Sequence, residues 1–532
     1  MNKTLLLGDE AIAQGALDAG LSGVYAYPGT PSTEITEYIQ RSKEAKERNI
    51  HAAWATNEKT AMEAALGMSY SGKRAMACMK HVGLNVAADG FVNSAITGAH
   101  GGLVVVVADD PSMHSSQNEQ DSRYYGKFAM LPIIEPTNQQ EAYDAMYYGF
   151  DLSEMYGVPV LVRITTRMAH SRAGVLRKEL RKENTLSLPK DHRQFVLLPS
   201  IARRNYNTLL AKQQLFQEEA ERSEFNRYID AEDTSRGIIA CGLAYNYLME
   251  NFQHGCPYPV LKISQYPLPK ILIKKIFDAC EEILVLEEGA PFVEEQLRGA
   301  LDTSHRILGR LDGTIPRAGE LNPNIVAHAF QFPTQIGQSA DDLLVSRPPK
   351  LCDGCPHIDT FDALNEALRE VESGHVFSDI GCYTLGALPP YNAINSCVDM
   401  GASITMAKGA ADAGLTPSVA VIGDSTFTHS GMTGLLDAVI EDSPITLVIV
   451  DNETVGMTGG QHSNAQGRLE KIVRGLGVPE EHFHIIEPKR KNHPMNVEIM
   501  KKELAHRGVS VIIERRECIQ TAAETRKVAR KQ

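Results

Sequence analysis

The sequence lacks any long hydrophobic run and any excess of positive charge. Its longest apolar runs, at residues 103–108 and 445–450, are far shorter than the roughly 20 residues that cross a bilayer. A short apolar start gives way to polar residues at 8–10, so we expect no export signal and no membrane segment. Lys and Arg number 53 against 66 Asp and Glu, a net charge of −13, which argues against nucleic acid as the main ligand.

The sequence also lacks a paired cysteine framework. Its nine cysteines are an odd number and are scattered through the chain, which favours free thiols or metal ligands over disulfides. We therefore expect a reducing, cytoplasmic compartment. With 532 residues, of which 43% are hydrophobic and 22% charged, the chain has the composition of a globular protein with about three or four domains.

Three blocks of the chain alternate short apolar strands with helical stretches, which is typical of parallel α/β sheets. In the last block, residues 419–422 and 445–450 are apolar without alternation, as in strands buried on both faces of a doubly wound sheet. A charged, helix-favouring stretch separates the first two blocks and predicts a helical connector. We predict an α/β fold divided into four segments: residues 1–185, 186–235, 236–345 and 346–532.

Polar residues follow two neighbouring strands of the last block. Asp424 comes directly after the strand at 419–422, and Asn452 follows the strand at 445–450. In a β-α-β unit these strands are parallel neighbours, so both side chains are expected at their carboxyl ends. A carboxylate oxygen, an amide oxygen and a backbone carbonyl, with water and phosphate oxygens, complete the octahedron of Mg²⁺. Gly423 and the following helix start favour a diphosphate, so we predict a metal and diphosphate site.

The order Gly-Asp-Ser, helix, strand and Asn is similar to the thiamine diphosphate fingerprint, although Gly-Asp-Ser alone fits many strand-to-turn junctions. Seven further motifs make the chain resemble the indolepyruvate:ferredoxin oxidoreductase alpha subunits, over nearly its whole length and least at 171–235. They are YPGTPSTE at 27–34, NEKTA at 57–61, KHVGLN at 80–85, SSQNEQDSR at 115–123, CDGCPH at 352–357, SDIGCYT at 378–384 and GMTGGQ at 456–461.

The resemblance implies a fold with two doubly wound thiamine diphosphate-binding domains. The pyrimidine type is 1–185 and the diphosphate type 346–532, with a smaller, transketolase C-terminal-like α/β domain at 236–345 between them. It also implies oxidative decarboxylation of an aryl 2-oxo acid, of the indolepyruvate or phenylpyruvate class, to its acyl-coenzyme A. Electrons leave through iron-sulfur chemistry to a ferredoxin-like carrier. The expected assembly is a homodimer within a heterotetramer that contains a smaller beta-type subunit.

The resemblance also assigns roles to single residues. Asp424, Asn452 and the Thr454 carbonyl are expected to hold Mg²⁺. Other residues expected to contact the coenzyme are Gly423, Ser425, Gly456, Met457 and Glu58. Glu58 is expected to face the aminopyrimidine and to share a proton with its ring nitrogen. The alternative for Glu58 is a first-turn helix residue favoured by the helix dipole.

Three further residues of the N-terminal block are candidates for contacts with the substrate or the coenzyme. Arg123 and Thr30 are expected to hold the carboxylate of the 2-oxo acid by a charge-assisted pair and a hydroxyl bond. The alternative for Arg123 is a surface ion pair. His81 is expected to make a polar contact near the thiazolium, and its alternative is a packed or capping histidine.

Four cysteines have an order similar to the ligands of a proximal [4Fe-4S] cluster in related 2-oxoacid oxidoreductases: Cys352, Cys355, Cys382 and Cys518. Four thiolates are what such a cluster needs. The alternatives for the pair Cys352 and Cys355 are a zinc half-site or two buried thiols. The family's longer members also carry a ferredoxin-like domain with two CxxCxxCxxxC runs; this sequence has no such run, so we expect those two clusters to be absent.

Two other functions stay open at this point. Loss of electron-transfer domains is compatible with a non-oxidative thiamine diphosphate-dependent decarboxylase or carboligase. A non-catalytic subunit that binds thiamine diphosphate is the third possibility. Iron and sulfide content separates the first two functions, and the effect of Glu58→Gln separates both from the third.

Overall fold

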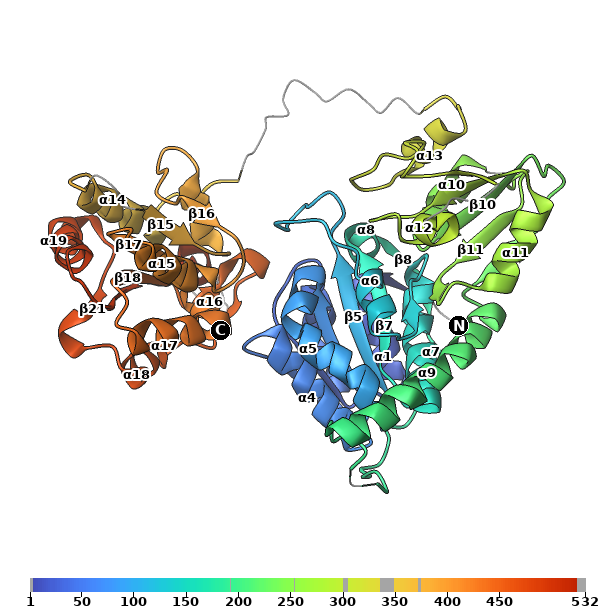
Figure 1. Ribbon diagram of the computed structural model, residues 1–532, viewed down its shortest axis with the longest axis horizontal. Coiled ribbons are helices and arrows are strands. Elements are labelled where there is room, and N and C mark those ends of the chain that lie inside the picture. The colour runs from blue at the N-terminus through green and yellow to red at the C-terminus, as the bar shows by residue number, and fades with distance from the viewer. Residues whose placement is uncertain are drawn as a thin grey trace. The chain divides into compact units, whose positions relative to one another are not determined.

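The computed structural model describes residues 3–191, 193–252, 254–299, 305–334, 349–371 and 375–523. The chain divides into two compact units, Met1–Gln338 and Ser339–Gln532 (Figure 1). Each unit is built on mainly parallel sheets with helices between the strands. The predicted α/β class is therefore confirmed.

The first unit contains a seven-stranded sheet in which every strand is parallel to its neighbour except the edge strand β12. Its spatial order is β12 (Gln265–Tyr266), β6 (Ile133–Ile134), β7 (Val160–Thr165), β5 (Leu103–Asp109), β4 (Ala75–Lys80), β2 (Gly23–Ala26) and β3 (His51–Trp54). A short antiparallel pair, β1 (Lys3–Leu7) with β8 (Arg172–Leu176), stands apart from it.

Helices cover both faces of the seven-stranded sheet. Helices α1 (Gly8–Asp18), α2 (Thr33–Arg41) and α7 (Gln139–Tyr156) share one core with its first face. Helices α4 (Glu58–Tyr70), α5 (His81–Thr97) and α9 (Pro199–Arg222) share a second core with its other face. Residues 103–108 are buried on both sides, because a run without polar alternation suits a strand between two helical layers.

A smaller five-stranded sheet completes the first unit. Its order is β14 (Arg306–Leu308), β13 (Glu282–Leu286), β10 (Arg236–Cys241), β11 (Val260–Ile263) and β9 (Arg227–Ile229), with only β9 antiparallel. Helices α10 (Ala244–Asn251) and α13 (Pro323–Ala329) pack on one face. The other face, with α11 (Lys270–Ala279) and α12 (Phe292–Arg298), shares the second core of the larger sheet.

The charged stretch between these two sheets contains one long helix. Helix α9 has 24 residues, and it buries Leu209 and Phe216 in the core that joins the two sheets. Strand β12 also leaves the smaller region to pair with β6 of the larger sheet. The stretch 186–235 therefore contains helix α9, which packs in the core shared by the two sheets, and also strand β9 of the smaller sheet.

The second unit contains a six-stranded, fully parallel sheet among its described residues. Its order is β16 (Ser396–Cys397), β15 (His375–Ser378), β17 (Ser418–Gly423), β18 (Ile445–Asp451), β22 (Ser510–Arg515) and β21 (Phe483–Ile486). Helices α15 (Ala402–Asp412), α17 (Met432–Ile440) and α18 (Leu469–Gly475) cover one face, and α14 (Pro356–Leu368) with α19 (His493–Leu504) the other. The sheet is doubly wound.

The predicted domain boundaries stay predictions. The boundary between 345 and 346 falls among residues 335–348, outside the described residues. None of the helices in the described ranges combines the length and the apolar character that crossing a bilayer requires.

Candidate active site

Asp424 and Asn452 follow neighbouring parallel strands of the second unit. The register pairs Gly423 at the end of β17 with Val450 near the end of β18, as the β-α-β pattern predicts. Asp424 is buried, and burial raises the pKa of its carboxyl to about 7. Its Oδ2 atom has no hydrogen-bond partner in the described part of the chain. A buried carboxylate oxygen without a partner fits a divalent cation, which would supply the missing interaction.

The Asn452 side chain is oriented from two sides. Its Oδ1 accepts a hydrogen bond from the Thr454 backbone N–H at 3.2 Å, across a turn in which Glu453 has a φ of +63°. Its Nδ2 lies 3.5 Å from Nε2 of His357. Burial lowers the pKa of His357 to about 4, so the neutral ring can accept this hydrogen bond. Asn452 and Thr454 therefore belong to one fixed turn.

The remaining predicted coenzyme contacts lie around the same two strand ends. Ser425 is in the short helix α16 (Asp424–Thr426). Gly456 and Met457 form the turn η3 (Gly456–Thr458), between the paired strands β19 (Thr454–Val455) and β20 (Gln461–His462), and Met457 is exposed. The structure thus brings all the predicted metal and diphosphate residues of this unit to one edge of the sheet.

The SDIGCYT motif packs against this edge through Tyr383. A Cβ atom on Gly423 would lie 2.7 Å from Cε1 of Tyr383, and one on Gly381 would lie 2.2 Å from the same atom. The Tyr383 hydroxyl donates to Asp379, which also accepts from Ser403 Oγ at 2.7 Å. Both glycines are therefore required for close packing, and two motifs that are distant in the sequence form one group.

The four predicted cluster cysteines lie close enough for their charges to affect one another. Burial raises the pKa of Cys355 and of Cys382 to about 11, and the charges of Cys352 and Cys518 act on both thiols. No three of their sulfur atoms lie within 4.8 Å of one another among the described residues. The ligands of a tetrahedral zinc ion lie about 2.3 Å from the metal, so these sulfur atoms as placed do not form a zinc site of three or four cysteines.

Two contacts join the cysteines to the coenzyme edge. A Cβ atom on Gly456 would lie 2.9 Å from Sγ of Cys382. The Cys518 backbone N–H donates to the Asn452 carbonyl oxygen at 3.1 Å. The cysteine group and the predicted Mg²⁺ ligands are therefore adjacent within the second unit.

Glu58 in the first unit is both the first residue of a helix and a buried acid. Asn57 caps helix α4 by accepting from the Thr60 N–H at 2.8 Å. The Glu58 side chain turns inward and is only 5% exposed. It lies against the first turn of α5, where a Cβ atom on Gly83 would lie 2.6 Å from Oε1 of Glu58. The helix-start alternative alone does not explain this burial.

Lys80 lies beside Thr30, although sequence reasoning gave it no role. Its Nζ donates to the Ser115 carbonyl oxygen at 3.1 Å, and the Ser115 hydroxyl donates to the Thr30 carbonyl oxygen at 3.2 Å. Burial lowers the pKa of Lys80, while the charges of Asp110 and Glu58 oppose this shift. The position of Lys80 at the end of a parallel strand, directly before His81, is the signal that could have identified it.

Arg123 is not a surface residue and presents no exposed side chain to a ligand. It is 0% exposed. Its guanidinium forms ion pairs with Asp121 and, at 3.0 Å, with Glu287, and it donates to the carbonyl oxygens of Glu288 and Ala290. The surface ion pair alternative is wrong, and the predicted contact with a substrate carboxylate finds no support in this geometry.

His81 is packed at the start of α5. The side chain is 1% exposed, and its Nε2 lies 3.2 Å from both the backbone and the side-chain oxygen of Asn118. Its Nδ1 has no hydrogen-bond partner within the described ranges. The packed alternative holds, and a role near the coenzyme stays a prediction.

Two family models match the chain. Residues 14–210 match the thiamine diphosphate-binding domain of pyruvate flavodoxin/ferredoxin oxidoreductases. Residues 379–513 match the C-terminal TPP-binding domain of thiamine pyrophosphate enzymes. The first match contains every strand of the larger sheet except β12, and the second covers most of the sheet of the second unit.

Relatives cover the chain almost completely. The indolepyruvate oxidoreductase subunit IorA of Archaeoglobus fulgidus is 40% identical over 97% of this chain and 86% of its own length. The subunit of the same name from Methanothermobacter thermautotrophicus is 38% identical over 99% of this chain and 88% of its own. This chain belongs to the IorA family. The resemblance read from the motifs is confirmed, and so is thiamine diphosphate as the coenzyme.

A solved structure agrees with the fold of this IorA family member. The 2-oxoglutarate:ferredoxin oxidoreductase of Magnetococcus marinus, solved with 2-oxoglutarate, coenzyme A and succinyl-CoA bound, superposes with a TM-score of 0.51 at 15% identity. The match covers 62% of this chain and 65% of that chain. At this identity the likeness concerns the fold, and it confirms the predicted thiamine diphosphate-binding architecture.

Proposed function

We propose that this protein is the coenzyme-binding, catalytic subunit of a complex that oxidatively decarboxylates an aryl 2-oxo acid to its acyl-coenzyme A. The observation that carries the proposal is the buried Oδ2 of Asp424, which has no hydrogen-bond partner among the described residues and lies beside Asn452 and a group of four cysteines. The names of the relatives support indolepyruvate as a substrate, and we propose the wider class of indolepyruvate and phenylpyruvate. Thiamine diphosphate supplies the electron sink at the carbonyl carbon of the acid.

The second unit would hold the metal and the diphosphate. Asp424, Asn452 and the Thr454 carbonyl would be the protein ligands of Mg²⁺, which prefers such oxygen donors. Gly423 has no side chain to block a diphosphate. The N–H groups of the turn after β17 would face its negative charge.

The first unit would supply the groups that act on protons and on the substrate. Glu58, a buried carboxyl group, would hold a proton at the aminopyrimidine of the coenzyme. Lys80, beside Thr30, would bind the carboxylate of the 2-oxo acid by a charge-assisted hydrogen bond. Lys80 replaces Arg123 in this role because the guanidinium of Arg123 is engaged inside the protein. His81 would contribute a polar contact.

The cysteines would give the electrons a route away from the coenzyme. Cys352, Cys355, Cys382 and Cys518 would hold one [4Fe-4S] cluster. The contacts of Cys382 with Gly456 and of Cys518 with Asn452 support a short path from the coenzyme to this cluster. A ferredoxin-like carrier would accept the electrons, and an oxygen-sensitive cluster suits the cytoplasm. We infer a homodimer in a heterotetramer with a smaller beta-type subunit.

The test is anaerobic turnover of the complex assembled with its partner subunit. Indolepyruvate, phenylpyruvate and pyruvate are compared with a viologen dye as acceptor, with and without coenzyme A. We expect dye reduction with the aryl acids that needs coenzyme A, and four irons per chain. Decarboxylation without dye reduction, in reconstituted protein that holds no iron, would support the non-oxidative alternative. Unchanged activity of Glu58→Gln would support the non-catalytic one.

A further inference from the structure

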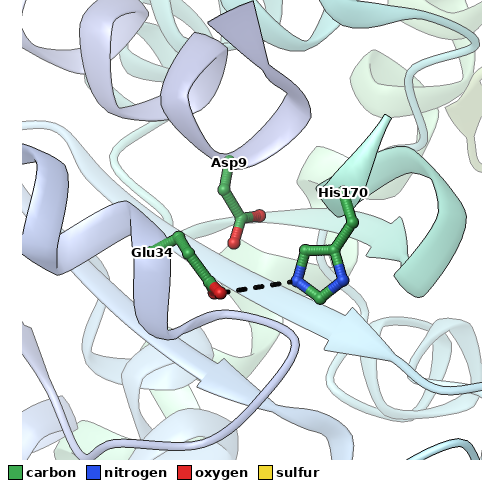
Figure 2. A group of neighbouring side chains, drawn as sticks. All are labelled: Asp9, Glu34 and His170. Carbon is green, nitrogen blue, oxygen red and sulfur yellow. Dashed lines mark ion pairs between the residues drawn. The ribbon is translucent and has the colours of Figure 1, made fainter. Parts of the chain in front are cut away.

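Three side chains from distant parts of the sequence meet in the first unit. Asp9 lies in the first turn of α1, Glu34 in the first turn of α2, and His170 at the end of α8 (Thr166–His170). Their ligand atoms all lie within 4.8 Å of one another, and Oε1 of Glu34 is 3.7 Å from Nε2 of His170. Figure 2 shows the three side chains pointing toward one another from three separate elements.

Asp9 is the buried member of this cluster. It is 0% exposed, and neither of its carboxylate oxygens has a hydrogen-bond partner in the described part of the protein outside the cluster. Oε2 of Glu34 is also buried without a partner there. Buried carboxylate oxygens are costly unless a donor or a cation satisfies them. Asp9 points toward Glu34 and His170 (Figure 2), so such a cation would lie between the three side chains.

The backbone holds the cluster together. The Gly8 N–H donates to the Ser171 carbonyl oxygen at 3.2 Å, and a Cβ atom on Gly8 would lie 2.0 Å from the Met168 carbonyl oxygen. The start of α1, which carries Asp9, is therefore fixed to the end of α8, which carries His170. Because no larger residue fits at position 8, this close approach depends on glycine.

We propose that Asp9, Glu34 and His170 form a binding site for a divalent transition-metal cation such as Zn²⁺. One imidazole nitrogen and two carboxylates match the ligands of zinc, whereas Mg²⁺ favours oxygen donors alone. The side chains of Glu34 and His170 are 38% and 37% exposed, so a cation can enter from solvent and keep a water ligand. This site is separate in the chain from the Mg²⁺ ligands of the second unit.

A shared proton between Asp9 and Glu34 is the competing explanation. Burial and the charge of Glu34 raise the pKa of Asp9 well above its usual value, and Glu10 adds to this effect. The His170 side chain acts in the opposite direction on Glu34, whose pKa is lowered. A metal titration distinguishes a bound cation from a trapped proton, because only a metal site gives binding that saturates as the metal concentration rises.

The test is equilibrium binding of Co²⁺, a spectroscopic substitute for Zn²⁺, to the full-length protein. The protein is kept anaerobic with its cluster reconstituted and with saturating Mg²⁺ and thiamine diphosphate, so that the four proposed cluster cysteines and the coenzyme site are occupied. Wild type is compared with Asp9→Asn, which preserves shape, and with His170→Gln, which replaces a partly exposed side chain. Glu37→Gln is the matched control, since it removes a carboxylate one turn further along α2.

We expect one Co²⁺ per chain to bind wild type and Glu37→Gln with equal affinity, and at least tenfold more weakly to Asp9→Asn and His170→Gln. The melting temperature should rise with Zn²⁺ in wild type and not in Asp9→Asn. Equal Co²⁺ binding by all four proteins would overturn the proposal. So would an Asp9→Asn protein that is more stable than wild type at every metal concentration, since that result identifies a trapped proton. If Asp9→Asn does not fold, His170→Gln alone decides between these outcomes.

Discussion

The substitution Gly83→Ala is expected to displace the Glu58 carboxylate while Glu58 itself is unchanged. The new Cβ atom would lie 2.6 Å from Oε1 of Glu58, whereas ordinary contacts begin at 3.4 Å. Cγ and Cδ of Glu58 would also lie only 2.7 and 2.9 Å from the new Cβ atom. The whole Glu58 side chain must therefore shift, and its carboxylate moves by about 0.8 Å or more. A misplacement of about 1 Å can cost about 100-fold in rate, which corresponds to about 2.7 kcal/mol of transition-state stabilisation.

Gly90→Ala is the matched control on the same helix. The nearest atom to its new Cβ would be Cγ of Met62 at 3.5 Å, an ordinary contact. Both substitutions replace a glycine inside a helix by alanine, and this replacement by itself stabilises a helix by about 0.5–1 kcal/mol. We expect Gly90→Ala to keep wild-type turnover and to melt at the same temperature or slightly higher. Gly83→Ala should bind the coenzyme normally but turn over about 100-fold more slowly.

Two assays separate the chemistry from the fold. Exchange of the thiazolium C2 proton of bound coenzyme for deuterium, followed by NMR after acid quenching, reports the proton transfer that Glu58 assists. Anaerobic reduction of a viologen dye by a 2-oxo acid reports the whole reaction. If Gly83→Ala equals Gly90→Ala in both assays, the position of Glu58 does not matter and its proposed role is refuted.

Three further predictions concern other groups. Asp424→Asn should weaken Mg²⁺-dependent coenzyme binding at least 100-fold in calorimetry, because the amide loses the charge that the cation needs. Lys80→Ala should raise the KM for the 2-oxo acid about tenfold or more, because one charge-assisted hydrogen bond is lost. Lys80→Arg should bring the KM part of the way back to the wild-type value, and neither variant should change the affinity for the coenzyme. Glu514 is fully buried, and burial raises its pKa to about 7. Ionising the Glu514 carboxyl costs the folded state up to about 3 kcal/mol. The free energy of unfolding of wild type should therefore fall as pH rises from about 4.5 to 7. Glu514→Gln should melt at a higher temperature than wild type at pH 8 but not at pH 4.

The metal and diphosphate edge was predictable because it depends on neighbours in the sequence. Two apolar runs without alternation predict adjacent buried strands, and parallel strands place their carboxyl ends together. Asp424 and Asn452 follow such strands, and the register of β17 and β18 places them side by side. Nothing beyond one β-α-β unit was needed for this inference.

The cluster of Asp9, Glu34 and His170 was not predictable in this way. These residues lie on three helices that share no local pattern, and the contact between α1 and α8 depends on the absence of a side chain at Gly8. A sequence pattern identifies which residues lie at the end of an element, but it does not determine which elements pack against each other at their ends. Contacts of this kind require the tertiary structure.

Arg123 and Lys80 illustrate how burial decides which cation can meet a substrate. Both lie within conspicuous motifs, and from the sequence Arg123 is the better candidate because a guanidinium matches a carboxylate in geometry. In the structure, however, Arg123 is surrounded by acidic groups that include Asp121, just before helix α6 (Arg123–Phe128), and Glu287, directly after β13. Removing one partner of such a buried pair typically costs about 3–5 kcal/mol of stability. Selection for stability alone is therefore sufficient to explain Arg123, whereas the partly desolvated Lys80 beside Thr30 forms few internal bonds and keeps its ammonium group able to bind an anion.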